Sequence, residues 1–266
     1  MRRLRPNLRR VGSYDFITYA GERLVRCLVI SDIHANRPAL EAVLKDAGSF
    51  DIIWCLGDLV GYGPDPNECI ERIQDFDHIS LAGNHDWAAI GRLNLDQFNM
   101  DARTTSAWTR QELCPAGREY LEALPTHMVQ GDFTLAHGSP REPVWEYLLD
   151  AGIALLSFSY FTTPICLVGH THIPVIFGLD EEHDRCYPLV PPYSQPIQLS
   201  VYRMILNPGS VGQPRDGDPR ASYAILDTEA MTWEHRRVSY PIEITQERMR
   251  ARNLPRRLIE RIATGR

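Results

Sequence analysis

The sequence predicts an α/β protein in which helices cover a largely parallel sheet. Short apolar runs alternate with amphipathic segments through the first third of the chain, a pattern typical of strand and helix units. Several of these apolar runs end at Asp, Asn, Gly or His. Beyond residue 174 the chain changes to β-rich segments separated by Pro and Gly. Because ligands gather at the carboxyl ends of parallel strands, these ends are the expected place for a functional site.

The first strand and helix unit begins at the apolar run 25–31, which predicts a buried strand. Asn36 is suited to cap the next helix, whose first turn holds Pro38 and which is expected to end at Gly48. A second strand is expected over 51–56.

The next helix is expected to open at Asp65. A capping residue followed three positions later by Glu68 is typical of a capping box, in which each side chain accepts a hydrogen bond from the backbone of the other. The third strand is expected over 78–82.

The remaining elements follow from the same patterns. A helix interrupted near Pro115 is predicted over 100–124, and a second helix over 151–161. Strands are predicted over 126–130, 133–136, 164–168, 174–179, 202–206, 221–227 and 232–239. From about residue 244 the chain predicts an Arg-rich helix broken at Pro255. We therefore expect a basic extension over 1–24, one domain over 25–246 and an Arg-rich helical tail over 247–266.

Composition and charge exclude several classes of protein. The chain is 44% hydrophobic and 23% charged, which is typical of a globular protein. Its apolar runs are far shorter than the roughly eighteen residues of a membrane span, so no membrane partner is expected. The formal charge is −6, with +4 on residues 1–24 and +5 on residues 247–266, which leaves −15 on the body. An acidic body makes a nucleic-acid polymer an improbable partner.

Cysteine usage indicates a reducing compartment. The six cysteines include no C-x-x-C pair, and three lie in apolar runs, which favours buried reduced thiols. The Arg-rich N-terminal segment lacks an apolar stretch of the signal-peptide type. The expected location is the cytoplasm.

Metal-binding residue types recur at five predicted strand ends. The segments are Asp32-Ile33-His34, Gly57-Asp58, Gly83-Asn84-His85-Asp86, Ala136-His137-Gly138 and Gly169-His170-Thr171-His172. Five of the nine histidines lie in them, and carboxylate oxygens with imidazoles suit divalent first-row metals. The seven candidate ligands exceed what one ion with an open position uses, so two ions are expected. The seven candidate ligands are Asp32, His34, Asp58, Asn84, His137, His170 and His172.

The charge of such a centre favours an anionic substrate. Two neighbouring ions need a bridging ligand, and a carboxylate can supply it. Two divalent ions with Asp32, Asp58 and a bridging hydroxide carry a charge of about +1, which suits a phosphate ester.

The order of these motifs, D-x-H, G-D, G-N-H-D, H-G and G-H-T-H, resembles the calcineurin-like metallophosphoesterase superfamily over about residues 25–240. The segments 32–36 and 207–210 look most like its small prokaryotic phosphodiesterase branch, which usually has Gly where this chain has Ala35. The resemblance implies an α/β (α+β) four-layer sandwich. In that fold two mixed sheets are flanked by helices, and the dinuclear metal site lies at the strand ends.

The resemblance also implies roles for individual residues. Asp32, His34 and His172 would hold the first metal, Asn84, His137 and His170 the second, and Asp58 would bridge them. His85 would protonate the leaving oxygen while a metal-bridging hydroxide attacks phosphorus in line, and Asn84 and His85 would contact the substrate phosphate. Manganese is the expected metal, with Fe, Zn, Ni, Co and Mg as alternatives.

The function expected from the resemblance is a phosphodiesterase acting on a small-molecule or nucleotide substrate. A phosphomonoesterase, a protein phosphatase and a non-catalytic binding protein on the same fold are the alternatives. Protein phosphatases of the superfamily carry an Asp-Arg pair shortly after the bridging Asp, where this chain has Gly61 and Tyr62. That departure favours diester or small-molecule hydrolysis.

For each of the other residues near the motifs, two roles are considered. Asp86 is expected to support either a metal ligand or the loop backbone. For Arg215 a surface salt bridge is favoured over contact with substrate phosphate. For Tyr62 and Trp87 core packing is favoured over stacking on a nucleoside.

Overall fold

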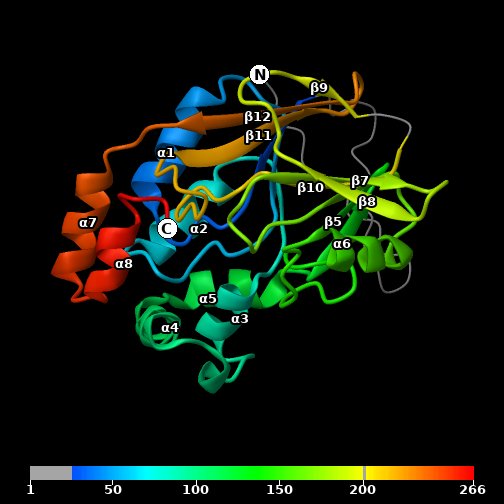
Figure 1. Ribbon diagram of the computed structural model, residues 1–266. Helices are drawn as coiled ribbons and strands as arrows, with labels where there is room; N and C mark the ends of the chain where they lie inside the picture. Colours follow the sequence, from blue (N-terminus) through cyan, green and yellow to red (C-terminus); the bar gives the residue numbers. More distant parts are fainter. Residues whose placement is uncertain (1–25, 200–201) are drawn as a thin grey trace, which may run out of the picture.

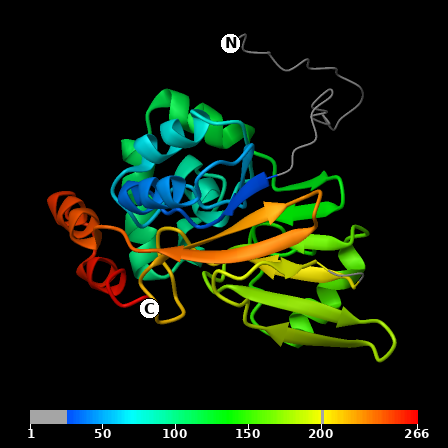
Figure 2. The same cartoon turned by 90° about the horizontal axis from the view of Figure 1, so that it is seen from above.

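Two six-stranded mixed sheets face each other in the computed structural model, which describes residues 26–199 and 202–266 (Figures 1 and 2). The first sheet has the order β3-β2-β1-β11-β12-β9 and the second the order β4-β5-β6-β10-β7-β8. The strands of the first are β1 (Arg26–Ile30), β2 (Ile52–Cys55), β3 (His78–Ser80), β9 (Ile197–Gln198), β11 (Ala221–Asp227) and β12 (Thr232–Val238). Those of the second are β4 (His127–Gln130), β5 (Phe133–Ala136), β6 (Ile165–Leu167), β7 (Val175–Asp180), β8 (Arg185–Leu189) and β10 (Met204–Asn207).

Helices cover the outer faces of the sandwich and complete the expected four layers. They are α1 (Arg37–Asp46), α2 (Pro66–Gln74), α3 (Asn84–Ile90), α4 (Met100–Glu112), α5 (Pro115–Ala123), α6 (Ala151–Ser157), α7 (Ile242–Ala251) and α8 (Arg256–Arg261). Two short 3₁₀ segments are η1 (Leu95–Gln97) and η2 (Phe158–Tyr160). The expected fold class is confirmed.

Parallel pairing is confined to part of each sheet. Strands β1, β2 and β3 are mutually parallel, as are β5, β6 and β10, while the other pairs are antiparallel. The largely parallel sheet expected from local patterns is therefore correct only for these segments. Their carboxyl ends nevertheless meet at one edge of the sandwich, where ligands gather in sheets of this kind.

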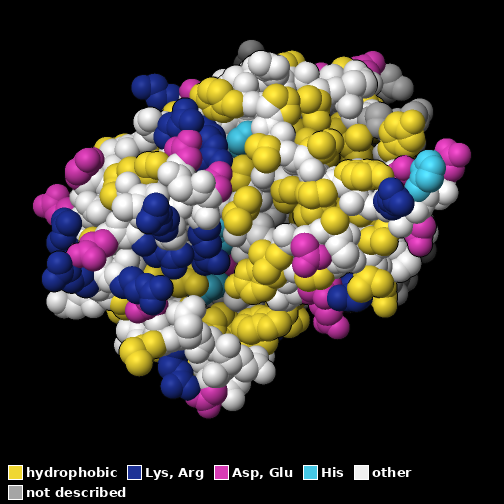
Figure 3. Space-filling model, in the orientation of Figure 1, with side chains coloured by type: hydrophobic (Ala, Val, Ile, Leu, Met, Phe, Trp, Pro, Cys, Tyr) yellow, Lys and Arg dark blue, Asp and Glu magenta, His cyan; other side chains and the backbone are white. Residues whose placement is uncertain are grey.

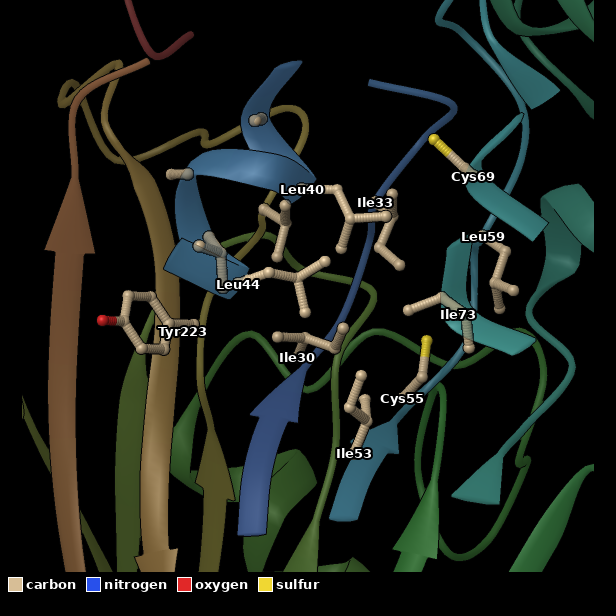
Figure 4. Packing of buried hydrophobic residues seen from close by; sticks show 14 of the residues in the cluster. Ile30, Ile33, Leu40, Leu44, Ile53, Cys55, Leu59, Cys69, Ile73 and Tyr223 are labelled. Atoms are coloured by element: carbon tan, nitrogen blue, oxygen red, sulfur yellow. The ribbon is translucent and has the colours of Figure 1, made fainter. Parts of the chain in front are cut away.

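Alternate side chains of β1 point to opposite faces of the first sheet and so connect the layers. Leu28 and Ile30 point toward the helices, whereas Cys27 and Val29 face the second sheet. Figure 4 shows Ile30 packed with Leu40 of α1 and Ile73 of α2. Both faces of β1 are fully buried, which explains why its sequence is a continuous apolar run.

The structure differs from the sequence-based expectations in three unpredicted elements and one helix cap. Helix α3 and the strands β8 and β9 were not predicted. Asp65 precedes α2 as expected, but its side chain makes no capping bond. Its Oδ2 instead accepts a hydrogen bond of 2.7 Å from Arg248 of α7. A charged partner from the far end of the chain thus replaces the backbone N–H.

The expected Arg-rich helix broken at Pro255 corresponds to α7 and α8, with Pro255 at the start of α8. Both helices pack against the body of the protein through a cluster that includes Tyr62, Met249, Leu258 and Ile259. Helix α7 spans the expected boundary at residue 247. The expected extension 1–24 lies outside the described residues.

The cysteines agree with the expectation of reduced thiols. All six are free, and all except the partly exposed Cys114 are buried. In the part of the chain that the structure describes, no helix combines the length and apolar character required to cross a bilayer.

His235 of β12 is buried as a neutral imidazole. Its Nε2 lies 2.8 Å from Ser222 Oγ, which itself donates to the carbonyl oxygen of Pro208, so Nε2 must carry the hydrogen. Its Nδ1 is buried and has no hydrogen-bond partner. Burial therefore lowers the pKa of His235 to about 4.

We predict that this histidine makes the fold sensitive to acid. The neutral form stabilises the protein fully above the unfolded pKa of about 6.5, and this contribution is lost as the pH falls toward 4. Between pH 7 and pH 4.5 the free energy of urea unfolding should fall by about 2 kcal/mol more in the wild type than in His235→Gln. Equal losses in the two proteins would contradict this assignment.

Candidate metal centre

The seven predicted ligands lie together at the carboxyl ends of the parallel strands. Asp32 and His34 follow β1, Asp58 follows β2 and Asn84 opens α3 directly after β3. In the second sheet, His137 follows β5, and His170 and His172 follow β6. All seven side chains are buried, with at most 3% of any residue exposed.

The loops that carry these residues adopt strained backbone conformations. Five of the seven have positive φ angles: Asp32 (55°), His34 (48°), Asp58 (54°), His170 (65°) and His172 (61°). For residues other than Gly this left-handed region costs roughly 1–2 kcal/mol each. Such strain is typical of functional sites, where the surrounding structure enforces it.

Backbone hydrogen bonds between the first two loops enforce part of this strain. The amide of Asp32 donates to Gly57 O at 3.0 Å, and the amide of His34 donates to Asp58 O at 3.0 Å. Ala35 also has a positive φ of 50°, a backbone conformation that favours Gly.

Each of the four predicted imidazole ligands has one ring nitrogen against a backbone carbonyl. The pairs are His34 Nδ1 with Val60 O (3.2 Å), His137 Nδ1 with Leu56 O (3.0 Å), His170 Nε2 with Trp145 O (3.1 Å) and His172 Nδ1 with Gln213 O (2.5 Å). A carbonyl accepts only, so these nitrogens carry the hydrogens. The opposite nitrogen of each neutral ring then presents a lone pair, which is the state that binds a metal.

These opposite nitrogens converge in two pairs. His34 Nε2 lies 3.1 Å from His172 Nε2, and His137 Nε2 lies 3.1 Å from His170 Nδ1. Two lone pairs at this distance repel unless a proton or a cation lies between them. Asn84 joins the second pair, with its Oδ1 3.3 Å from His137 Nε2.

Carboxylate oxygens without hydrogen-bond partners face both pairs. Asp32 Oδ1 is buried and lies 3.2 Å from His172 Nε2. Asp58 Oδ2 is also buried and unpartnered, 3.7 Å from His34 Nε2 and 3.3 Å from His137 Nε2. One oxygen of Asp58 therefore faces both sets of imidazoles. This donor set fits two divalent cations that share Asp58.

The charges of the centre are strongly coupled. Burial would raise the pKa of Asp32 and of Asp58, but the neighbouring imidazoles hold both pKa values well below the usual range. Burial alone would lower the pKa of His137, but the carboxylates of Asp58, Asp32 and Asp86 together raise that pKa to about 9. The proton on His137 occupies the place that a cation would take.

His85 lies beside this donor set and is held by aromatic packing. Its ring centroid is 4.3 Å from that of Tyr62 and 5.4 Å from that of Phe98. Its Nδ1 is buried without a hydrogen-bond partner. A side chain at Gly61 would place its Cβ 2.6 Å from this nitrogen, so no carboxylate fits there. Burial lowers the pKa of His85 to about 4, and a nearby anion would be needed to keep it protonated at neutral pH.

Asp86 supports the backbone of the loops, which was one of its two expected roles. Its Oδ2 accepts hydrogen bonds from the amides of Asp58 and Gly83, both at 2.9 Å, and its Oδ1 accepts one from Val60 at 3.1 Å. Gly83 is required here because a Cβ would overlap Asp58 Oδ1. The carboxylate of Asp86 thus fixes the loop that carries Asp58.

Sequence reasoning missed the loop between β5 and α6. Tyr147 stacks on His170 with ring centroids 3.7 Å apart, and Trp145 supplies the carbonyl that orients the same imidazole. Both aromatic residues remain partly exposed. Two large aromatic residues close together in a polar loop were the signal available in the sequence.

Two further expectations can be compared with the structure. Tyr62 is buried and packs among neighbouring side chains, as favoured. The surface salt bridge favoured for Arg215 is wrong, because no carboxylate lies within 4.0 Å of Arg215 among the described residues. Its guanidinium lies next to Tyr62 instead.

We predict that Asp86→Ala destabilises the protein and loosens the centre. The change leaves three buried amides without acceptors, each costing about 1–3 kcal/mol, so the free energy of unfolding should fall by at least 2 kcal/mol. Retained metal should fall with it, measured by elemental analysis after gel filtration. The matched control is Asp75→Ala, which removes an exposed carboxylate. If both variants unfold at the same denaturant concentration, Asp86 has no such role.

Comparison with protein families gives one match that covers most of the chain. The model described as "Calcineurin-like phosphoesterase superfamily domain" matches residues 25–231. This range contains every residue of the candidate centre.

Two curated proteins are similar over most of their lengths. The Methanocaldococcus jannaschii protein MJ0912 is 39% identical over 246 residues, which cover 90% of this chain and 97% of the relative. The Escherichia coli protein named phosphodiesterase YfcE is 25% identical over 221 residues, covering 79% of this chain and 91% of the relative.

A solved structure agrees closely with the fold described here. The crystal structure of a metallophosphoesterase from Sphaerobacter thermophilus has a TM-score of 0.84 and 52% sequence identity. The match covers 91% of this chain and 99% of that one.

Proposed function

The chain belongs to the calcineurin-like phosphoesterase superfamily and is a phosphoric ester hydrolase, and on this basis we propose that it is a dinuclear phosphodiesterase of small-molecule or nucleotide esters. One observation carries the proposal: paired imidazole nitrogens and the unpartnered Asp58 Oδ2 converge at the strand ends. The E. coli relative named a phosphodiesterase supports the choice of diesters. Gly61 and Tyr62, in place of the Asp-Arg pair of protein phosphatases, support it further.

The proposed ligand sets follow the two groups of converging nitrogens. Asp32, His34 and His172 would hold one ion, and Asn84, His137 and His170 the other. Asp58 would contribute to both, because its Oδ2 faces both groups. Two bound divalent ions would supply charge neutralisation at the phosphoryl oxygens and lower the pKa of a coordinated water enough for it to act as nucleophile.

The protein's own residues would orient the reactants. The backbone carbonyls behind the four imidazoles fix the ring tautomers, so the donors need no rearrangement when cations bind. Asn84 and His85 open α3 at the edge of the centre and would contact the substrate phosphate. His85 would then transfer a proton to the leaving oxygen, since the packing of Tyr62 and Phe98 fixes the direction of its ring.

The proposal also covers the identity of the metal and the cellular location of the protein. Manganese is the proposed metal, because hard carboxylate and amide oxygens are mixed here with imidazoles. The six free cysteines support a reducing compartment, so the cytoplasm is the proposed location.

We predict that His85→Ala loses activity according to the leaving group. With manganese, the wild type should hydrolyse both bis-p-nitrophenyl phosphate and diphenyl phosphate. Loss of a general acid costs about 10²–10⁴-fold, but nitrophenolate departs with little need of a proton. The variant should therefore lose much more activity on diphenyl phosphate than on the nitrophenyl ester.

His183→Ala is the matched control, because this exposed histidine lies outside the centre. Its activity on both esters should equal that of the wild type. An equal loss on both esters in His85→Ala would exclude the proton-transfer role. A wild-type protein that holds two metals but hydrolyses no ester would overturn the proposed function.

A further inference from the structure

A group of basic side chains borders the candidate metal centre. Figure 3 shows Lys and Arg side chains gathered over the C-terminal helices and the adjoining loop, with histidine surface at their border and hydrophobic side chains opposite. Arg215 lies against Tyr62, which neighbours the centre, and Arg261 belongs to α8, which packs in one cluster with Tyr62. The two arginines come from different elements of the fold.

Arg215 lies in the loop between β10 and β11 and is joined directly to the centre. Its amide donates a hydrogen bond to His172 O at 3.3 Å, which joins its backbone to that of a predicted ligand. Its Nη2 lies 3.1 Å from Gln213 Oε1 and 3.5 Å from the hydroxyl of Tyr62. Its Nε is buried without a hydrogen-bond partner. In residues 26–199 and 202–266 no carboxylate pairs with this guanidinium.

Arg261 reaches the same place from α8. The apolar face of this helix, including Leu258 and Ile259, packs in one cluster with Tyr62. The Nε of Arg261 donates to a terminal oxygen of Arg266, and within the described chain no Asp or Glu side chain lies within 4.0 Å of its guanidinium. Burial and the positive charge of Arg215 lower the pKa of Arg261.

A backbone hydrogen bond joins the two segments that carry the arginines. The amide of Gly217, two residues after Arg215, donates to Gly265 O at 2.8 Å. Figures 1 and 2 both show the C-terminal end beside the β10–β11 loop. Two like charges placed near each other cost free energy, part of which a bound anion would return.

Tyr62 sets the separation between these cations and the metal centre. Its ring centroid lies 4.7 Å from that of His34 and 5.9 Å from Arg215 Cζ. The guanidinium is therefore one aromatic ring away from a predicted metal ligand. One small molecule can therefore span both places.

We propose that Arg215 and Arg261 form a subsite for a second phosphate group, so that the preferred substrate is an ester carrying a further phosphate beside the scissile one. Guanidinium groups bind phosphate through paired charge-assisted hydrogen bonds, and two of them match a phosphate dianion. The assignment of this phosphate as part of a substrate rests on the proposed phosphoesterase function. It gives the Arg-rich C-terminal helix a part in recognition.

Two matched esters test the subsite by activity. One is the p-nitrophenyl ester of thymidine 5′-phosphate, and the other is the same ester with an added 3′-phosphate. With the metal-loaded full chain, the added phosphate should raise kcat/KM for nitrophenol release by about tenfold or more. Arg215→Gln and Arg261→Gln should bring this ratio toward one. Because both esters are measured on the same variant, partial unfolding cancels from the ratio.

Arg256→Gln is the control, since this arginine lies on the same helix but is fully exposed and pairs with Glu260. Its ratio should equal that of the wild type. A wild-type ratio near one, or a ratio unchanged in both test variants, would overturn the subsite even if both esters are hydrolysed.

Calorimetric binding separates the subsite from the catalytic proposal. Thymidine 3′,5′-bisphosphate should bind the metal-loaded protein about tenfold more tightly than thymidine 5′-phosphate, and the difference should vanish in Arg215→Gln. If this preference is found in a protein that hydrolyses neither ester, the subsite stands and the proposed function fails. Equal affinities for the two nucleotides would overturn the subsite.

Discussion

The structure depends on buried carboxylate oxygens and imidazole nitrogens that converge at the strand ends. Asp58 Oδ2 faces imidazole nitrogens from both sheets, and all of these groups are hidden from water. In the absence of cations, protons such as the one on His137 must compensate the negative charge. The surrounding architecture maintains this costly arrangement, through left-handed loop residues, carbonyls behind each imidazole and three amides bound by Asp86.

The sequence allowed the centre to be located because its chemistry coincides with regular local patterns. Each predicted ligand follows an apolar run, and Asp32 and His34 illustrate how a strand end presents two of them. Helix α3 was not predicted because its first turn consists of the polar residues Asn84, His85 and Asp86, which show no helical pattern of apolar residues. The mixed pairing of the sheets depends on contacts between distant segments, such as β1 with β11, which local periodicity does not report.

Long-range contacts also explain the errors at single residues. Asp65 has the sequence context of a capping residue, but Arg248, far along the chain, takes its carboxylate. Arg215 looked like a surface residue because the sequence does not show that α8 folds back over Tyr62. The packing of α8 over Tyr62 also brings part of the basic C-terminal segment close to the acidic body. Under the proposed function, an acidic body accepts an anion where bound cations, Arg215, and Arg261 of the basic C-terminal segment would lie near one another.

The central claim is that Asp58 joins two cations in one centre. Electron paramagnetic resonance of the protein loaded with two equivalents of manganese tests it most directly, because ions that share a ligand are magnetically coupled. The account predicts the spectrum of a coupled pair in the wild type and its loss in Asp58→Asn. A wild-type spectrum of isolated manganese ions at full loading would contradict it.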